Sequence, residues 1–262
     1  MHRTLVILVT LTFLVNGIID PMDTYNKYRT EIDQAVSWFW ETRNSQSGAQ
    51  LVKDAGTRGA VTGGKQLDAF LVLLKKIAID LGVPEENIHL KGNQLPGYFR
   101  ATKDWDFIIS TPNKHLVCCI ELKSQVGSFG NNFNNRTEEA IGSAVDLWTA
   151  YREGVFPPQQ QPWVGYILMV EKSAKSTAPV SVKEPFFETL PEFRSASYLK
   201  RYEILCRKLV LERHYTAASL IATSNVDGKV EYESADNETS LELFLNSFAG
   251  HILGRLSEFN AH

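Results

Sequence analysis

The spacing of apolar residues divides the first half of the chain into helical and extended segments. Apolar positions recur at helical spacing between residues 24 and 41. A stronger apolar stripe runs from position 67 to 81 and is ended by Gly82 and Pro84. The stretch between them, 45–64, is rich in small and polar residues and predicts a long loop. Short apolar runs predict strands at 87–91, 106–110 and 115–123, with a turn at 111–114 that makes the last two a hairpin.

The second half continues the alternation of helices and strands. A polar, Asn-rich stretch at 124–136 predicts a loop, and a helix is expected from Thr137 to about Glu153. The apolar run 164–170 predicts a buried strand. Helices follow at 197–212 and 239–256, the latter opened by a capping box at 239–242, and strands at 217–223 and 229–233. The central order of helix, three strands, helix and strand predicts an α/β sandwich with a mixed central sheet flanked by helices.

Composition and charge narrow the class of protein. The chain has 262 residues, of which 44% are hydrophobic, and these values fit one large domain, expected to span residues 22–262. The net charge of −3 argues against a protein that coats nucleic acid without specificity. Three cysteines, without ligand spacing, argue against a disulfide framework or a zinc site. We therefore expect a cytoplasmic protein with no membrane partner.

Residues 1–21 permit two interpretations. An apolar run at 5–15, preceded by Arg3, resembles the core of a short signal peptide and is too short to span a bilayer. The alternative is that translation starts at Met22, from which the sequence opens directly into an amphipathic helix pattern. We favour the start at Met22, and the secreted enzyme remains the alternative.

Chemistry is concentrated in the predicted hairpin. A period of two places Val117, Cys119, Glu121 and Lys123 on one face of the strand 115–123, and the opposite face is wholly apolar. Asp106 begins the preceding strand, so the hairpin should bring it beside the acid and the lysine. Two carboxylates and an amine suit Mg²⁺-dependent hydrolysis of a phosphodiester, with Asp106 and Glu121 as metal ligands and Lys123 beside the attacking water. A surface hairpin with an exposed Glu/Lys pair is the alternative.

Two further groups of residues support the nuclease interpretation. The predicted loop 124–136 offers base-reading or phosphate-binding side chains, Asn131, Asn132, Asn134, Asn135 and Arg136, although an ordinary Asn-rich turn is the alternative. At the start of the second helix, Lys65 is a candidate phosphate contact or a solvated lysine. Asp68 is a candidate third metal ligand or an ordinary first-turn aspartate.

These residues also carry a family resemblance. Asp106, followed fifteen residues later by Glu121-Leu122-Lys123, resembles the signature of PD-(D/E)XK nucleases, with Trp105 where that signature has proline. Together with the stretches 63–68, 92–107 and 123–139, the chain from about Asp23 to its end resembles the XhoI family of type II restriction endonucleases.

The resemblance implies a PD-(D/E)XK restriction-endonuclease-like core and a homodimer that cuts double-stranded DNA with Mg²⁺. It further implies cleavage within the palindrome CTCGAG, 5′-phosphate ends, and a cognate DNA methyltransferase in the same restriction-modification system. Two alternatives stay open. One is a structure-specific or repair nuclease of the same fold, and the other is a DNA-binding protein of this fold that has lost catalysis.

Overall fold

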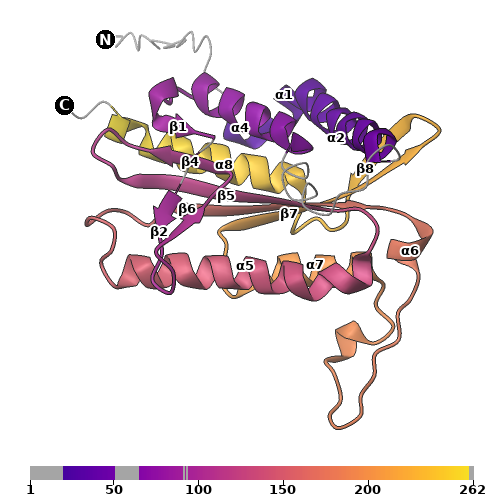
Figure 1. Cartoon of the computed structure of the whole chain (residues 1–262). Coiled ribbons are helices and arrows are strands. Elements are labelled where there is room, and N and C mark those ends of the chain that lie inside the picture. The colour runs from indigo at the N-terminus through magenta and orange to yellow at the C-terminus, as the bar shows by residue number, and fades with distance from the viewer. Residues whose placement is uncertain (1–19, 51–64, 91, 93, 260–262) are drawn as a thin grey trace, which may run out of the picture.

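The computed structural model describes residues 20–50, 65–90, 92 and 94–259. Within them a six-stranded mixed sheet lies between two layers of helices (Figure 1). Its order is β1-β4-β5-β6-β7-β8, and β5, β6 and β7 are parallel, whereas the other neighbours pair antiparallel. The strands are β1 Ile88–His89, β4 Phe107–Ser110, β5 Leu116–Gln125, β6 Trp163–Glu171, β7 Ala217–Val226 and β8 Lys229–Ser234.

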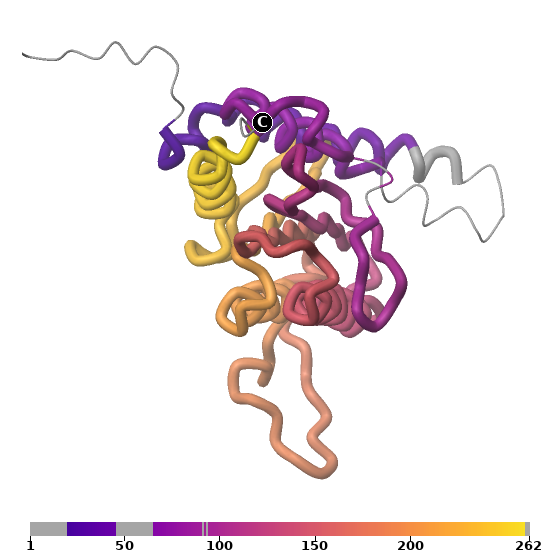
Figure 2. Tube along the Cα trace, turned by 90° about the vertical axis from the view of Figure 1, so that its left-hand side faces the viewer, coloured from indigo at the N-terminus to yellow at the C-terminus, as the bar shows by residue number. Residues whose placement is uncertain are grey.

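The helices cover both faces of this sheet. One layer holds α2 Arg29–Gln50, α4 Asp68–Asp80 and α8 Leu241–Arg255, and the other holds α5 Phe129–Arg152 and α7 Tyr198–Leu211 (Figures 1 and 2). Shorter helices are α1 Thr24–Lys27 and α6 Ala174–Thr177, and 3₁₀ turns occur at Pro21–Asp23, Glu85–Asn87, Pro191–Phe193 and Leu256–Phe259. Among the described residues, no helix combines the length and apolar character needed to cross a membrane. The predicted mixed sheet flanked by helices is confirmed.

Two apolar clusters form the core, one on each face of the sheet. The first joins α2, α4 and α8 to the sheet and contains Phe39, Leu74 and Phe248, each at most 1% exposed. The second joins α5 and α7 to the sheet and contains Cys119 and Tyr166, which have no exposed surface. All three cysteines are buried and free, as the sequence indicated.

A polar contact at the edge of the first layer joins α1 to α4. The Tyr28 hydroxyl donates to an Asp80 carboxylate oxygen at 2.8 Å, and the Lys76 ammonium donates to the same oxygen at 2.7 Å. The hydrogen bond from Lys76 lowers the pKa of Asp80 below its ordinary value; partial burial opposes this shift, and the Tyr28 bond adds to it.

Several element boundaries differ from the predictions. Helix α2 continues to Gln50, so residues 45–50 are helical instead of part of a loop. The helix cap before α8 is Ser240, whose hydroxyl accepts from the Leu243 amide at 3.1 Å. The predicted capping box at 239–242 is therefore wrong, because the cap lies one residue later and Leu243 has no polar side chain to complete a box. The predictions for residues 1–19 and 51–64 lie outside the described residues.

A small hairpin beside the main sheet was not predicted. It consists of β2 Gln94–Pro96 and β3 Thr102–Asp104, paired antiparallel. Its strands are only three residues long and carry mostly polar, partly exposed side chains, so they lack the apolar alternation that identifies a strand. This hairpin leads directly into β4 and therefore into Asp106.

Candidate active site

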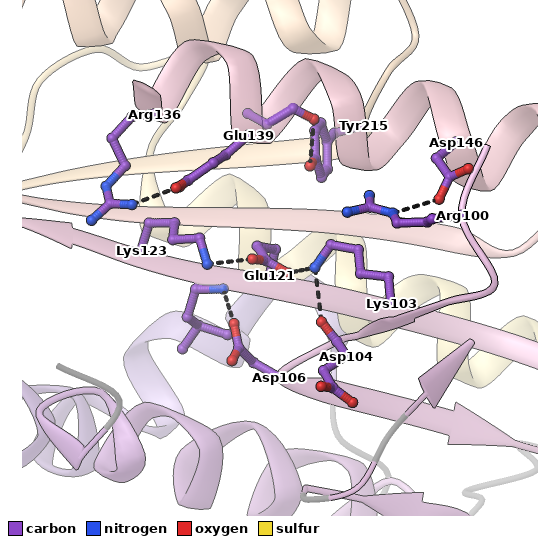
Figure 3. Close-up of polar contacts among 12 residues, drawn as sticks. Arg100, Lys103, Asp104, Asp106, Glu121, Lys123, Arg136, Glu139, Asp146 and Tyr215 are labelled. Atoms are coloured by element: carbon purple, nitrogen blue, oxygen red, sulfur yellow. Dashed lines mark hydrogen bonds and ion pairs between the residues drawn. The ribbon is translucent and has the colours of Figure 1, made fainter. Parts of the chain in front are cut away.

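The hairpin of β4 and β5 brings the three predicted catalytic residues together. Phe107 pairs with Ile120, so Asp106 and Glu121 are the next residues across the ladder. The Leu122 amide donates to Asp106 Oδ2 at 2.7 Å and fixes that carboxylate (Figure 3). The Lys123 ammonium pairs with Glu121 Oε1. The predicted convergence of two carboxylates and one lysine is therefore observed, although their catalytic role stays a prediction.

A bulge changes one detail of the predicted strand faces. Ile109 pairs with Cys118 but Ser110 pairs with Leu116, so Val117 is skipped in the ladder. Val117 consequently packs in the cluster with α4 and α8, not on the face of Cys119 and Glu121. The prediction that Val117 shares the face of Glu121 is therefore wrong, because a period of two holds only where the ladder is regular.

Lys103 is a site residue that sequence reasoning did not single out. Its ammonium donates to Glu121 Oε2 at 2.5 Å and to the Asp104 carbonyl at 2.8 Å, and it lies 4.6 Å from the centroid of the Trp105 ring. Its side chain is only 12% exposed. The available signal was the stretch 91–103, which carries three cations and no acid. The sequence did not indicate the short strand β3, which places the Lys103 side chain next to Glu121.

The electrostatics of the site favour a bound cation. Burial raises the pKa of Asp106, and the nearby Glu121 carboxylate raises it further. Burial lowers the pKa of Lys123, but its contacts with Glu121 outweigh this effect and raise the pKa above its ordinary value. Both ammonium groups, those of Lys103 and Lys123, pair with Glu121, whereas Asp106 accepts from the neutral Leu122 amide. A cation bound beside Asp106 would therefore relieve its repulsion with Glu121.

The oxygen donors fit Mg²⁺ with an incomplete protein shell. Asp106 and Glu121 supply hard carboxylate oxygens on neighbouring strands, which is the donor type that Mg²⁺ prefers. The described residues contain no group of three or more Asp, Glu, His or Cys side chains placed to hold a metal. Mg²⁺ commonly keeps several waters and takes substrate phosphate oxygens as further ligands, so two carboxylates are a sufficient protein contribution.

Asp68 and Lys65 are not brought to this site. Asp68 begins α4 and lines a groove between α2 and α4, together with Trp38 and Glu31. Lys65 is exposed nearby, and its carbonyl accepts from the Trp38 indole at 3.4 Å. The α4 layer and Glu121 lie on opposite faces of the sheet, so we do not include Asp68 among the proposed metal ligands.

The Asn-rich stretch is helical, which corrects the predicted loop at 124–136. Strand β5 continues to Gln125, Gly127 and Ser128 turn the chain with positive φ angles, and α5 begins at Phe129. Phe129 and Phe133 lie one helical turn apart and pack on the Tyr198 and Tyr202 rings of α7. The helical spacing of Phe129 and Phe133 already indicated a helix in the sequence, and the loop prediction overlooked it.

The asparagines therefore occupy the outer face of the first turns of α5. Asn131, Asn134 and Asn135 are exposed, and the Asn132 amide donates to the Ser128 carbonyl at 3.2 Å. Arg136 pairs with Glu139 at 2.6 Å (Figure 3). None of these five residues is among those lining the pocket described next, so as DNA contacts they would lie outside it.

An open pocket of about 550 Å³ lies over Glu121 and Lys123, between the β2–β3 hairpin and α5. Its lining includes Phe99, Arg100 and Lys103 from the hairpin, Glu121 and Lys123 from β5, and Glu138 and Glu139 from α5. Glu121 and Lys123 therefore face the pocket, whereas Asp106 is not among its lining residues.

Two tyrosines on the buried side of the pocket differ in their hydrogen bonds. Tyr166 is the β6 neighbour of Glu121, and burial raises the pKa of its hydroxyl well above the usual value. That hydroxyl has no hydrogen-bond partner within the described part of the chain. The Tyr215 hydroxyl, by contrast, donates to the Ala140 carbonyl at 3.0 Å. The two phenols therefore provide a matched pair for testing the polar core behind the site.

Comparison with known proteins connects this geometry to a family. The family model described as restriction endonuclease XhoI matches residues 44–234. The type II restriction enzyme BstVI of Geobacillus stearothermophilus is 47% identical over 207 residues, which cover 76% of this chain and 92% of that protein.

Two further relatives carry the same designation. The type II restriction enzyme XhoI of Xanthomonas vasicola is 46% identical over 182 residues, covering 68% of this chain and 73% of that protein. The type II restriction enzyme AbrI of Azospirillum brasilense is 41% identical over 165 residues, covering 61% and 74%. No solved structure matches the chain. The chain therefore belongs to the XhoI family of type II restriction endonucleases, which are site-specific deoxyribonucleases.

Proposed function

We propose that this enzyme cuts double-stranded DNA at the palindrome CTCGAG in a Mg²⁺-dependent reaction that leaves 5′-phosphate ends. The observation that carries the chemistry is the convergence of Asp106, Glu121 and Lys123 at one end of the β4–β5 hairpin. The proposed recognition sequence rests on the 46% identity to the type II restriction enzyme XhoI. The proposed Mg²⁺ dependence and 5′-phosphate ends likewise rest on membership of the XhoI family.

Each residue of the site has a separate proposed role in the reaction. Asp106 and Glu121 would hold Mg²⁺, which would offset charge on the scissile phosphate and promote deprotonation of the attacking water. The Leu122 amide keeps Asp106 oriented toward Glu121. Lys123 orients the attacking water, and Lys103 supplies a second cation for a phosphate oxygen. Attack of the water oxygen on phosphorus breaks the bond to the 3′ oxygen, so the phosphate stays on the 5′ end.

A palindromic site also implies a symmetric enzyme. Two copies related by a two-fold axis would present one site to each strand, so we propose a homodimer. A cognate DNA methyltransferase would protect host DNA in the cytoplasm. We further propose that residues 22–262 form one endonuclease domain, and that Lys65, Arg136 and the four asparagines on α5 position or read the DNA outside the pocket.

Digestion of plasmid DNA tests the proposal directly. Wild-type protein should give discrete bands with Mg²⁺ and none with EDTA, and sequencing the ends should give CTCGAG with 5′-phosphates. Lys123→Ala should lose cleavage by at least about a hundredfold. Lys175→Ala is the matched control, because Lys175 is exposed on α6 and does not line the pocket.

Other outcomes have defined meanings. A smear of fragments would contradict site-specific cleavage and favour a structure-specific nuclease of the same fold. Discrete bands at another sequence would overturn CTCGAG while leaving the catalytic assignment intact. Full activity of Lys123→Ala would remove Lys123 from the mechanism.

A further inference from the structure

The tip of the β2–β3 hairpin, residues 97–101, stands at the rim of the active-site pocket. Phe99 and Arg100 from this tip line the same pocket as Glu121 and Lys123. Lys103, six residues after Gly97, reaches Glu121 itself. A DNA strand whose phosphate enters the pocket must therefore pass beside the tip.

A buried aspartate on α5 fixes the shape of this tip. Asp146, only 4% exposed, accepts from the Tyr98 amide at 2.8 Å and the Phe99 amide at 2.7 Å through Oδ1. Its Oδ2 accepts from Arg100 Nε at 2.7 Å (Figure 3). A Cβ on Gly97 would lie 2.4 Å from Asp146 Oδ2, so the approach of the tip to the carboxylate requires glycine at this position. The clamp presents the tip in one conformation before any ligand binds.

The clamped tip exposes two large aromatic side chains. Tyr98 is 51% exposed and Phe99 is 70% exposed, and their rings meet edge to face at 5.0 Å. Exposed apolar side chains would gain free energy if a partner buried them. Because the backbone of the tip is already fixed, less entropy would be lost when a partner binds. The tip therefore has the properties of a preformed contact surface.

Charge favours nucleic acid as the partner of this surface. The stretch 91–103 contains Lys91, Arg100 and Lys103 and no acidic residue. In the fold, Arg100 pairs with Asp146 and Lys103 with Glu121, and both cations line the pocket. Aromatic rings combined with cations match the two parts of a nucleotide, the base or sugar and the phosphate.

A second exposed aromatic pair in the chain shows the opposite pattern. Phe186 and Phe187, 88% and 89% exposed, lie in the segment that projects beyond α5 and α7 (Figure 2). Three glutamates and two cations surround them in the sequence, at positions 184, 188 and 192 and at 183 and 194. This pair does not line the active-site pocket and provides a matched control.

We propose that residues 97–101 form a preformed DNA-contacting element, in which the rings of Tyr98 and Phe99 pack against nucleotides flanking the cleaved phosphodiester. Asp146 is its positioning residue, because its carboxylate holds Tyr98, Phe99 and Arg100. The proposal rests on the DNA-cleaving function above and adds the part of the enzyme that engages the duplex beside the scissile bond. Packing of an aromatic side chain on a base would also unstack the duplex locally.

Binding of a duplex in Ca²⁺, which is expected to support binding without cleavage, tests the proposal. The probe is a duplex carrying the sequence that wild-type protein cuts, CTCGAG under the proposal above, with 2-aminopurine beside the scissile step. Phe99→Ala should bind this duplex roughly tenfold more weakly and should lose the fluorescence rise that reports unstacking. Phe99→Tyr should retain binding within about twofold, because it keeps the aromatic face. Phe186→Ala/Phe187→Ala should match wild type.

Each result has a defined consequence. Wild-type binding and fluorescence for Phe99→Ala would overturn the proposal, as would an equal loss in the Phe186→Ala/Phe187→Ala control. Dissociation of the protein into monomers by Phe99→Ala, seen by analytical ultracentrifugation without DNA, would reassign the tip to a protein interface and also overturn it. Failure of wild-type protein to cut any site would instead contradict the proposed function, so the two failures are distinguishable.

Discussion

Replacing Lys103 by methionine should improve Mg²⁺ binding and slow DNA cleavage at the same time. Lys103 donates to Glu121 at 2.5 Å, and Glu121 is one of the two carboxylates proposed to bind the metal. Bound Mg²⁺ must displace this hydrogen bond and tolerate the nearby ammonium, and both effects oppose metal binding. Methionine keeps much of the apolar stem of Lys103 but removes the ammonium group, including its contact with the Trp105 ring.

The structure sets the size of the two effects. A hydrogen bond to a charged group contributes about 1.5–3 kcal/mol, and the 12% exposure of the Lys103 side chain limits screening by solvent. The lower end of that range corresponds to roughly tenfold tighter Mg²⁺ binding. Loss of one cation from the scissile phosphate should lower the maximal cleavage rate by about a hundredfold.

Two measurements separate these effects. The rise in melting temperature with Mg²⁺ reports metal binding by the DNA-free protein. Single-turnover cleavage as a function of Mg²⁺ concentration reports both the half-saturating concentration and the maximal rate. Lys103→Met should reduce the half-saturating Mg²⁺ concentration and the maximal rate together, and Lys175→Met should change neither. Weaker Mg²⁺ binding by Lys103→Met in both measurements would refute the competition between Lys103 and the metal for Glu121.

Three other predictions concern the framework around the site. Tyr166→Phe should leave the free energy of unfolding unchanged or raise it, whereas Tyr215→Phe should lower it by about 1 kcal/mol. The reason is that, within the described residues, the Tyr215 hydroxyl has a hydrogen-bond partner and the Tyr166 hydroxyl has none. Equal losses of stability in chemical denaturation would contradict this contrast. Gly97→Ala should lower the free energy of unfolding by about 1–3 kcal/mol and weaken DNA binding, because the added methyl group overlaps the Asp146 carboxylate; a wild-type denaturation curve would show that the tip adapts. Asp80→Asn should destabilise the protein at pH 7 but not in acid. The lowered pKa of Asp80 means that its stabilisation is present above the unfolded value of about 3.9 and is lost as the pH falls through the folded value. A stability difference that does not shrink as the pH is lowered would refute this origin.

The catalytic hairpin was predictable from the sequence because its signals are local. Two apolar strands joined by a short turn bring Asp106 to the end of β5 that carries Glu121, and the bulge at Val117 sets the final register in which the two acids lie across from each other. An acid and a lysine at the end of an otherwise apolar strand required partners, and the structure supplies them. The central layers followed in the same way from the lengths and periods of the apolar runs.

The start of α5 shows where composition was misleading. Four asparagines within five residues suggested a loop, yet the helix is fixed by Phe129 and Phe133, which bury their rings against α7. Tertiary packing of one helical face outweighs the weak intrinsic preference of asparagine for turns. The tyrosines of α7 that bury these rings lie about seventy residues further along the chain. A prediction from local sequence therefore could not include them.

The sequence by itself determined the nuclease motif, the strand that carries Glu121 and Lys123, and the layered architecture, since each depends on residues close together in the chain. Only the tertiary structure decided that Lys103 shares Glu121 with Lys123, that Asp68 belongs to the opposite layer, and that Asp146 clamps the aromatic tip beside the pocket. These contacts join segments that are 18 to 48 residues apart or lie on different faces of the sheet. Apolar periodicity specifies which face of an element is buried, but polar side chains find their partners only after the faces have packed.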